Sequence, residues 1–311
     1  MREAGMREIV IISGKGGTGK TSLCAAFAAL ARNAVLCDLD VDVPDLHIVL
    51  NPKDGEGHVF MGGNKAQVRE EDCIGCGQCA DLCRFDAITM DEDRAHINEL
   101  NCEGCGVCVT LCPQKALDFP AARCGDWYVG ETRFGPFLHA VLIPGQENSG
   151  KLVTLLKREA RELAKQSGRE LILCDGSPGI GCPVISSLSG ATLAVAVVEP
   201  SLSGSHDFDR VARVCGHFRV PIGVIVNKAD INPEETDQII AYCEREGHTI
   251  LGTVPFSADI TRATIEGRAI TETDSELAAR LAQIWEKVDA LAESKARERL
   301  QLRTFSQASL A

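Results

Sequence analysis

The stretch Ser13–Thr21, with the sequence SGKGGTGKT, constrains the fold of this chain more than any other feature. It follows the apolar run Ile9–Ile12 and leads into Ser22–Arg32, which is predicted to be a helix. In a strand–loop–helix context, the pattern G-x-x-x-x-G-K-[ST] is typical of a loop that binds nucleotide phosphates. Glycines let backbone N–H groups wrap closely around phosphate oxygens at the helix start. The predicted nucleotide-binding residues of the loop are Gly14, Lys15, Gly16, Gly17, Thr18, Gly19, Lys20, Thr21 and Ser22.

Three residues of this loop have predicted individual roles. Lys20 would reach the β- and γ-phosphates, and the Thr21 hydroxyl would bind Mg²⁺. Lys15 gives the loop the form K-G-G-x-G-K-T, which resembles the deviant Walker A motif of the MinD/ParA/nitrogenase-iron-protein superfamily of ATPases. The resemblance implies that Lys15 reaches the nucleotide of a second subunit in a dimer that encloses ATP. The alternative is a solvated lysine on an exposed loop.

Composition narrows the class of protein. The 311 residues suffice for one large α/β core and a smaller module. The net charge of −12 argues against a broad nucleic-acid-binding surface. No apolar run is long enough to span a bilayer, and the N-terminus lacks the pattern of a signal peptide, so we expect a cytoplasmic protein. Fifteen cysteines in such a chain favour metal binding over a disulfide framework.

Strand-like and helix-like segments lie on both sides of a cysteine-rich stretch. The predicted strands are 35–40, 137–143, 171–175, 192–198, 221–226 and 249–252, and the predicted helices are 152–166, 207–218, 233–246 and 275–302. Their alternation predicts an α/β fold with a mostly parallel sheet and helices on both faces, here a P-loop NTPase. Residues 51–64 are predicted to be a turn-rich linker. We therefore expect an ATPase domain in two parts, 1–63 and 120–311, with an inserted domain at 64–119.

Eight cysteines form two copies of the pattern C-x-x-C-x-x-C-x-x-x-C. The first copy begins at Cys73 and the second at Cys102, 29 residues later. The spacing is that of bacterial two-cluster ferredoxins, in which four thiolates hold each 4Fe–4S cluster. Structural zinc is the alternative, but zinc sites do not typically contain this run twice. The inserted domain is therefore predicted to be ferredoxin-like and to bind two 4Fe–4S clusters.

The resemblance to two-cluster ferredoxins also implies how the ligands divide between the clusters. The fourth cysteine of each run ligates the cluster of the other run. One cluster would be held by Cys73, Cys76, Cys79 and Cys112, and the other by Cys83, Cys102, Cys105 and Cys108. Pro113 follows Cys112, whereas Arg84 follows Cys83, so the first copy lacks the proline of the pattern.

Acidic residues follow two of the predicted strands. The superfamily resemblance implies that Asp38 holds the hydration shell of Mg²⁺ and that Asp40 orients or activates the attacking water. The apolar strand 171–174 ends at Asp175 and resembles a Walker B motif. By the same resemblance, Asp175 would join Thr21 and Asp38 around Mg²⁺, and Gly179 would sense the γ-phosphate. Lys15, Lys20 and Asp40 are thus the predicted catalytic residues.

The sequence Asn227-Lys228-Ala229-Asp230 follows another predicted strand and fits a base-recognition loop. Asn227 would read the edge of the purine, with Lys228 and Asp230 beside it. Many GTPases select guanine with the form N-K-x-D, so GTP is the alternative nucleotide. The superfamily resemblance favours ATP.

Two of the remaining cysteines, Cys124 and Cys182, are candidate metal ligands. Cys182 lies between Gly181 and Pro183, shortly after Asp175, and the nitrogenase iron protein has a cluster ligand at that distance. Cys124 precedes a Gly-rich loop and is a candidate partner. Together they predict a third, dimer-bridging metal site, with two ordinary thiols as the alternative.

Three functions fit these features. The first is an Mg²⁺-dependent ATPase whose closure, as a homodimer or as a heterodimer with a paralogous ATPase, gates electron transfer through the clusters to a redox partner protein. The second is an ATP-dependent assembly or carrier protein that delivers an iron–sulfur or other metal cofactor to an accepting protein. The third is a positioning ATPase of the MinD or ParA kind. We expect no nucleic acid partner, and no membrane anchor, because the last helix lacks a basic amphipathic pattern.

Overall fold

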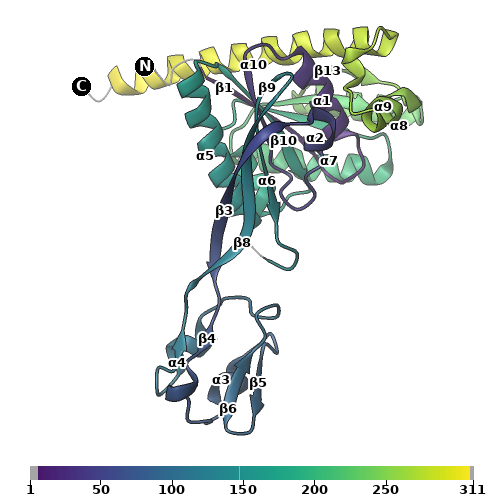
Figure 1. Cartoon of the computed structure of the whole chain (residues 1–311). Coiled ribbons are helices and arrows are strands. Elements are labelled where there is room, and N and C mark those ends of the chain that lie inside the picture. Colours follow the sequence, from purple (N-terminus) through teal and green to yellow (C-terminus); the bar gives the residue numbers. More distant parts are fainter. Residues whose placement is uncertain (1–5, 147, 309–311) are drawn as a thin grey trace. The chain divides into compact units, whose positions relative to one another are not determined.

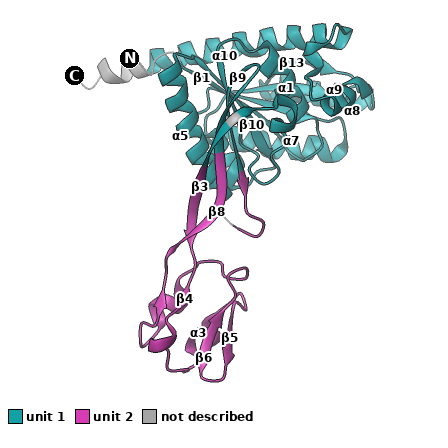
Figure 2. Ribbon diagram, viewed as in Figure 1, with its two compact units in different colours: residues 1–57, 128–140, 149–311 teal, residues 58–127, 141–148 magenta. Residues whose placement is uncertain are grey.

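The chain folds into two compact units, coloured separately in Figure 2. The computed structural model describes residues 6–146 and 148–308. The first unit contains the chain up to Gly57, then Tyr128–Ala140, and then the chain from Ser149 onward. The second unit contains His58–Trp127 and Val141–Asn148.

The first unit is built on a mostly parallel sheet. Its strands follow the order β13-β12-β11-β1-β10-β2-β9-β8-β3, and each neighbouring pair from β13 through β9 is parallel. Strand β8 is joined to β9 by a two-residue turn. The bounds are β1 Arg7–Ser13, β2 Ala34–Asp38, β3 Lys53–Asn64, β8 Ala121–Thr132, β9 Gly135–Leu142, β10 Leu171–Pro178, β11 Leu193–Val198, β12 Ile222–Asn227 and β13 Thr249–Val254.

Helices cover both faces of this sheet (Figure 1). The alternate residues Ile9 and Ile11 of β1 face a core shared with α1, α2 and α10, whereas α5, α6 and α7 bury their apolar residues on the other face. The helices are α1 Lys20–Leu30, α2 Leu46–Leu50, α5 Ser149–Ser167, α6 Cys182–Leu188, α7 Leu202–His217, α8 Pro233–Glu246, α9 Ala258–Ile265 and α10 Glu276–Ala308, with a 3₁₀ turn at Ile270–Glu272. The predicted α/β class is confirmed.

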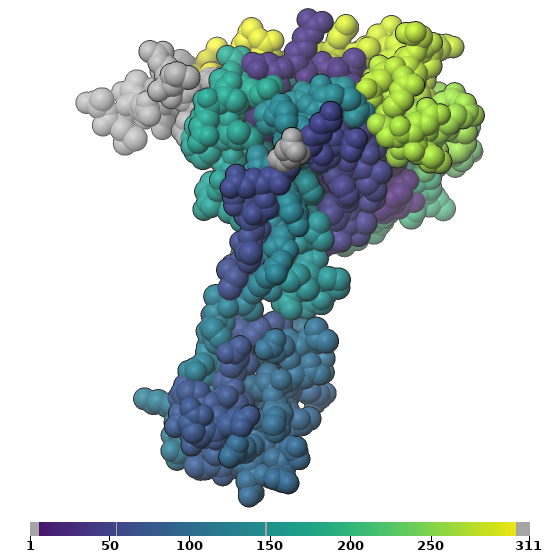
Figure 3. Space-filling view, in the orientation of Figure 1, coloured from purple at the N-terminus to yellow at the C-terminus, as the bar shows by residue number. Residues whose placement is uncertain are grey.

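The long last helix packs on its own unit. Its apolar residues Leu281, Ile284 and Val288 are at most 3% exposed and belong to the core that also contains α1. Other atoms of α10 lie on the surface of the unit, in yellow in Figure 3. Considering only the described residues, we find no helix long and apolar enough to cross a membrane.

The prediction of a linker at residues 51–64 is wrong. Most of this segment is the twelve-residue strand β3, and its neighbour in the sheet is β8. Glycines at positions 55, 57, 62 and 63 mask the strand pattern in the sequence, because glycine disfavours strands intrinsically. Hydrogen bonds to β8, a strand distant in sequence, override that local preference.

The second unit is small and has little regular structure. Besides parts of β3, β8 and β9, it contains the antiparallel pairs β4–β7 and β5–β6. Its elements are β4 Gln67–Val68, a 3₁₀ turn Glu70–Asp72, α3 Gln78–Leu82, β5 Ile88–Asp91, β6 Arg94–Ile97, α4 Val107–Leu111 and β7 Leu117–Asp118. Helices α3 and α4 are separated by the same 29 residues as the two cysteine runs. The internal repeat of the sequence is therefore a repeat of local structure.

A buried ion pair joins β1 to α5 in the first unit. Lys157 Nζ lies 2.7 Å from Glu8 Oε1 and donates to the carbonyl oxygen of Ser189 at 2.8 Å. Both side chains are at most 6% exposed. Lys157→Met removes the cation beside Glu8 Oε1 and the donor to the Ser189 carbonyl, while Arg161 Nη2 stays 2.7 Å from Glu8 Oε2. We therefore expect a loss of about 1–3 kcal/mol of unfolding free energy.

Equilibrium urea unfolding of the full chain measures this loss. Lys165→Met is the matched control on the same helix, because Lys165 forms an exposed pair with Glu162. Exposed pairs contribute about 0–1 kcal/mol. Equal losses in the two variants would contradict the buried pair's importance.

Candidate functional site

The predicted nucleotide residues meet at the carboxyl ends of the parallel strands. Ser13 ends β1, Asp38 ends β2 and Asn227 ends β12, while Asp175 lies near the end of β10. Open α/β sheets bind ligands at this edge. Helix α1 begins at Lys20, after Gly19 at φ 88°. A Cβ atom at Gly19 would lie 2.4 Å from Asn227 Nδ2, so the loop passes Asn227 too closely for any other residue.

Lys20 is surrounded by acidic side chains. Its Nζ donates to Asp175 Oδ1 at 2.7 Å and lies 3.6 Å from Asp40 Oδ2. Burial alone would lower the pKa of Lys20, but the Asp175 and Asp40 carboxylates outweigh burial and raise it. Lys20 is therefore a fully charged cation in a nearly closed site.

The acidic side chains of the site lie close enough together for their negative charges to repel one another. Burial and the nearby Asp175 carboxylate raise the pKa of Asp38 well above its usual value, against the opposing effect of Lys20. Burial also raises the pKa of Asp40. Within residues 6–146 and 148–308, the buried Asp175 Oδ2 has no hydrogen-bond partner. A site with this excess of carboxylate oxygens favours a cation.

Magnesium fits this donor set. Thr21 Oγ1 lies 3.5 Å from Lys20 Nζ, beside the carboxylates described above. Among the described residues, no three His, Cys, Asp or Glu side chains converge closely enough to bind a single metal ion. Carboxylate and hydroxyl oxygens are the donors that suit Mg²⁺, which typically uses one or two protein ligands and takes the rest from waters and substrate phosphates.

The loop after β10 is bonded to the loop after β1. The Gly179 N–H donates to the Ser13 carbonyl oxygen at 2.8 Å, and Ser177 Oγ donates to the Leu39 carbonyl oxygen at 2.9 Å. The backbone donor predicted to sense the γ-phosphate is therefore satisfied within the chain. These contacts also bring the segments that follow β2 and β10 together.

Lys15 is held by residues that sequence reasoning missed. Its Nζ donates to Ser201 Oγ at 3.2 Å and Ser203 Oγ at 3.1 Å, and lies 3.7 Å from Glu199 Oε2. Glu199 Oε1 also lies 3.6 Å from Lys228 Nζ. The polar run after the apolar strand β11 was the available signal, because it leaves the sheet at the same edge as the other site residues.

The predicted base-recognition loop lies against the phosphate-binding loop. Asn227 Nδ2 donates to the Thr18 carbonyl oxygen at 2.7 Å, and Lys228 Nζ donates to that of Gly17 at 3.0 Å. Asp230 Oδ1 instead accepts the Phe256 N–H at 2.6 Å, so it fixes the loop after β13. For the described part of the chain, the buried Asn227 Oδ1 has no hydrogen-bond partner.

The eight motif cysteines line two cavities in the second unit. Cys73, Cys76, Cys79 and Cys112 line one cavity of about 400 Å³, including its open mouth. Cys83, Cys102, Cys105 and Cys108 line the other, of about 310 Å³ on the same measure. The two groups are the ligand sets implied by the ferredoxin resemblance.

Each cavity has the number and kind of side-chain ligands that a 4Fe–4S cluster requires. Apart from the motif cysteine Cys102, the buried core cluster of this unit is small, consisting of Ala66, Ala87 and Leu117. The thiolates of a cubane bind four different iron atoms, so they lie farther apart than ligands of one ion. The Ala116 N–H also donates to Cys112 Sγ at 3.3 Å, as backbone amides do around cluster thiolates.

The other two candidate cysteines lie in different units. Cys124 is buried in the second unit, where its thiol donates to the Ala122 carbonyl oxygen at 3.5 Å. Cys182 is exposed and is the first residue of α6 in the first unit. A third metal site formed by this pair stays a prediction.

Comparisons with known proteins agree with this fold. Residues 9–270 match the CobQ/CobB/MinD/ParA nucleotide binding domain, called CbiA. The chain is 31% identical over 285 residues to the uncharacterised protein MJ0578 of Methanocaldococcus jannaschii, covering 90% of this chain and 96% of that protein.

Solved structures of MinD share the fold. The cell division ATPase MinD of Pyrococcus furiosus gives a TM-score of 0.56 at 18% identity, covering 92% of this chain and 99% of that one. MinD of Pyrococcus horikoshii, complexed with Mg-ADP, gives 0.56 at 20% identity, covering 93% and 98%. The chain therefore belongs to the CobQ/CobB/MinD/ParA nucleotide-binding family.

Proposed function

We propose that this chain is an ATP-hydrolysing iron–sulfur protein in which nucleotide-dependent dimerisation gates electron transfer to a partner protein. The observation that carries the proposal is the division of eight cysteines between two cavities, four to each. The same polypeptide contains the nucleotide site at Lys20, Asp40 and Asp175. When bound, two neighbouring 4Fe–4S clusters supply one-electron redox chemistry.

ATP is the nucleotide that this site favours. Asn227 commits its Nδ2 atom to the Thr18 carbonyl, which leaves the buried Oδ1 as an acceptor. Adenine presents an exocyclic amino donor on that edge, whereas guanine presents an acceptor oxygen. Asp230, which would have to bind guanine, already accepts the Phe256 N–H.

The side chains around the phosphate loop supply the groups that hydrolysis requires. Thr21, Asp38 and Asp175 would hold Mg²⁺ and its waters, and Lys20 would stabilise charge on the γ-phosphate. Asp40 is 14% exposed, and burial raises its pKa. A carboxylate with a raised pKa is suited to orient and activate the attacking water.

Asp40→Asn tests that assignment. The amide keeps the shape of the side chain but cannot accept a proton, so we expect kcat for ATP hydrolysis to fall about 10²–10⁴-fold, with ATP affinity nearly unchanged. Phosphate release and equilibrium nucleotide binding give the two quantities. The exposed neighbour Asp42 is the control, and comparable losses in Asp42→Asn would contradict a specific role for Asp40.

Lys15 is proposed to act between two subunits. Its amine now contacts Ser201, Ser203 and Glu199 of its own chain, and all three contacts must break before it reaches a partner's nucleotide. We expect Lys15→Ala to bind ATP as a monomer and to fail to dimerise. Light scattering with a non-hydrolysable ATP analogue measures the mass, and a dimer formed by this variant would overturn the role.

Electron paramagnetic resonance tests the gating itself. The anaerobic, dithionite-reduced protein is measured with Mg-ADP and with the Mg complex of a non-hydrolysable ATP analogue. We expect the cluster signals or their midpoint potentials to change between the two nucleotides. Two clusters that ignore nucleotide would defeat the gating proposal.

Cluster delivery is the second candidate function. It is favoured by the exposure of Cys76 and Cys105, one in each ligand set, because exposed ligands ease cluster release. Iron transferred to an apo-ferredoxin in an ATP-dependent manner would support delivery. Clusters that remain bound while electrons pass would support gating.

The third candidate is a positioning ATPase, because MinD of Pyrococcus horikoshii is a septum site-determining protein and MinD of Pyrococcus furiosus is a cell division ATPase. The fold of the nucleotide-binding unit supports it, but it assigns no task to the two cysteine-lined cavities. ATP-dependent co-sedimentation with liposomes would favour it over the first two.

A further inference from the structure

Helix α2 begins at an acid of the nucleotide site. The Leu46 N–H donates to Asp38 Oδ2 at 3.1 Å, while Asp38 Oδ1 accepts the Asp40 N–H at 3.0 Å. Asp38 is fully buried. A change of charge or position at this carboxylate therefore acts directly on the first residue of α2.

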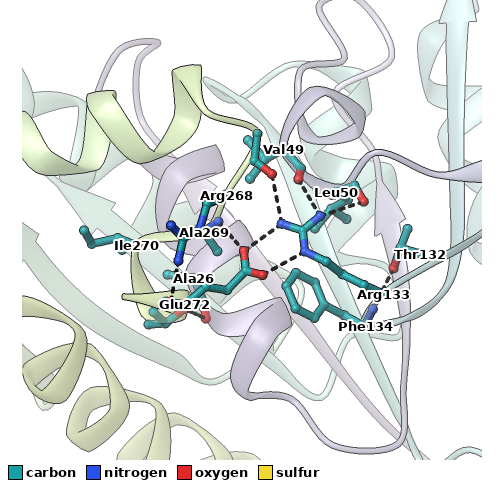
Figure 4. Close-up of polar contacts among 12 residues, drawn as sticks. Ala26, Val49, Leu50, Thr132, Arg133, Phe134, Arg268, Ala269, Ile270 and Glu272 are labelled. Carbon is teal, nitrogen blue, oxygen red and sulfur yellow. Dashed lines mark hydrogen bonds and ion pairs between the residues drawn. The ribbon is translucent and has the colours of Figure 1, made fainter. Parts of the chain in front are cut away.

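The other end of α2 is bound to Arg133, in the turn between β8 and β9. Arg133 Nη1 donates to the carbonyl oxygens of Val49 and Leu50, at 3.0 and 3.1 Å. These are the last two residues of α2, whose carbonyls lack partners within the helix. Figure 4 shows the guanidinium pointing at both of them.

The rest of the guanidinium is anchored by the segment after α9. Arg133 Nε and Nη2 donate to the two carboxylate oxygens of Glu272, at 2.8 and 2.7 Å, and Nη2 also donates to the Gly267 carbonyl at 3.1 Å. The hydrogen bond from Arg133 lowers the pKa of Glu272. Forked pairing of this kind is strong and directional, so Arg133 holds the end of α2 at a defined position (Figure 4).

One face of α2 also packs on the hairpin that strands β8 and β9 form. The His47 ring is stacked 5.4 Å from the ring of His139 on β9, with 9° between the planes. The His139 ring is stacked in turn 5.0 Å from that of Tyr128 on β8. The helix thus contacts the β8–β9 hairpin through its face as well as through its last turn.

Two strands beside α2 continue into the second unit. Strand β3 begins at Lys53, shortly after α2 ends at Leu50, and crosses into the second unit at His58. Strand β8 crosses at Trp127. A continuous set of hydrogen bonds and ring contacts therefore runs from Asp38 through α2 to the β8–β9 hairpin, and β8 is hydrogen-bonded to β3 in the sheet.

We infer that Arg133 is a positioning residue that makes α2 the mechanical link between the nucleotide site and strands β3 and β8. Nucleotide binding at Asp38 shifts α2, and Arg133 passes the shift to both strands. The inference rests on the proposed function only in taking nucleotide binding as the signal. It needs no cluster to be present.

Hydrogen exchange of the full, cluster-loaded chain tests this link. Exchange is measured by mass spectrometry for peptides covering 53–64 and 121–132, with Mg-ADP and with the Mg complex of a non-hydrolysable ATP analogue. We expect the nucleotide-dependent difference in these peptides to fall at least about fivefold in Arg133→Met. Iron content and nucleotide affinity should stay at the wild-type level.

Two further variants sharpen the result. Arg133→Lys keeps the charge but lacks the forked donor geometry, so we expect an intermediate difference; it also gives the answer should the methionine variant fail to fold. Arg158→Met is the matched control, since Arg158 is an exposed arginine paired with Glu159 on α5. It should match the wild type.

The link is refuted by a wild-type-sized difference in both Arg133 variants, by an equal loss in Arg158→Met, or by no difference in the wild-type protein. If the Arg133 link exists but nucleotide does not gate electron transfer, the two measurements give a different combination of results. In that case the exchange difference exists and depends on Arg133, while the resonance signals ignore nucleotide.

Discussion

Lys20→Met will reduce ATP hydrolysis by about 10³-fold or more. The Lys20 ammonium lies 3.6 Å from Asp40 and 2.7 Å from Asp175, and in the proposed mechanism it would neutralise charge on the γ-phosphate. Its loss removes that stabilisation and also leaves the carboxylates facing one another. We therefore expect weaker nucleotide binding in addition to the slower chemistry.

Phosphate release under saturating Mg-ATP, together with equilibrium nucleotide binding, measures both effects. The chain offers a matched control in Lys151, which lies in a second G-x-x-x-x-G-K sequence at residues 145–151. There Leu152 replaces the required serine or threonine, so Lys151→Met should change the rate by less than about twofold. A Lys20→Met protein that keeps a tenth of the wild-type rate would remove Lys20 from the mechanism.

The double variant Cys73→Ser/Cys76→Ser will lose about four of about eight iron atoms per chain. Both thiols line the first cavity, and two lost ligands leave too few to hold a cubane there. Iron analysis and reduced-state resonance spectra of the anaerobically purified protein report the result. Cys215→Ala, at a buried thiol of α7, is the control and should keep all the iron.

Two single-residue variants then test whether the fourth cysteine of each run ligates the cluster of the other run. Cys112 belongs to the second run in sequence but lines the first cavity with Cys73. Cys112→Ala should alter the resonance signal that the double variant removes, and Cys83→Ala should alter the other one. If each run instead held its own cluster, the two effects would be exchanged. Eight irons retained in every variant would reject both cluster sites.

The parts of the fold that could be predicted from sequence are those set by local pattern. The helix at Pro233–Glu246 is observed with the predicted bounds, because proline at its start and Gly247 after its end are strong local signals. The buried strands around the nucleotide site were equally predictable from their apolar runs. The order of β1 between β10 and β11 depends on distant pairing, which no local pattern specifies.

The residues of the candidate site divide in the same way, into those that a local sequence pattern predicts and those that depend on distant contacts. Motif residues such as Lys20 and Asp175 could be found because their chemistry requires fixed spacing. Arg133 could not, because it works through contacts with residues far away in the chain, such as Glu272 and Val49. The polar run after β11 places Glu199 at the same edge of the sheet, but it does not identify Lys15 as the partner of Glu199. An arginine in a two-residue turn resembles any solvated charge until the helix end that it binds is known.

The strand order also dictates a sequence of events during synthesis. Within residues 6–146 and 148–308, strand β1 pairs only with β10 and β11, and neither of these strands is synthesised until the ribosome has passed residue 170. The eight motif cysteines all lie between residues 73 and 112. The first strand of the nascent chain must therefore wait unpaired while the whole cysteine-rich unit emerges. Since domains fold as units during translation, the inserted unit is free to complete its fold before the sheet that hosts it can close.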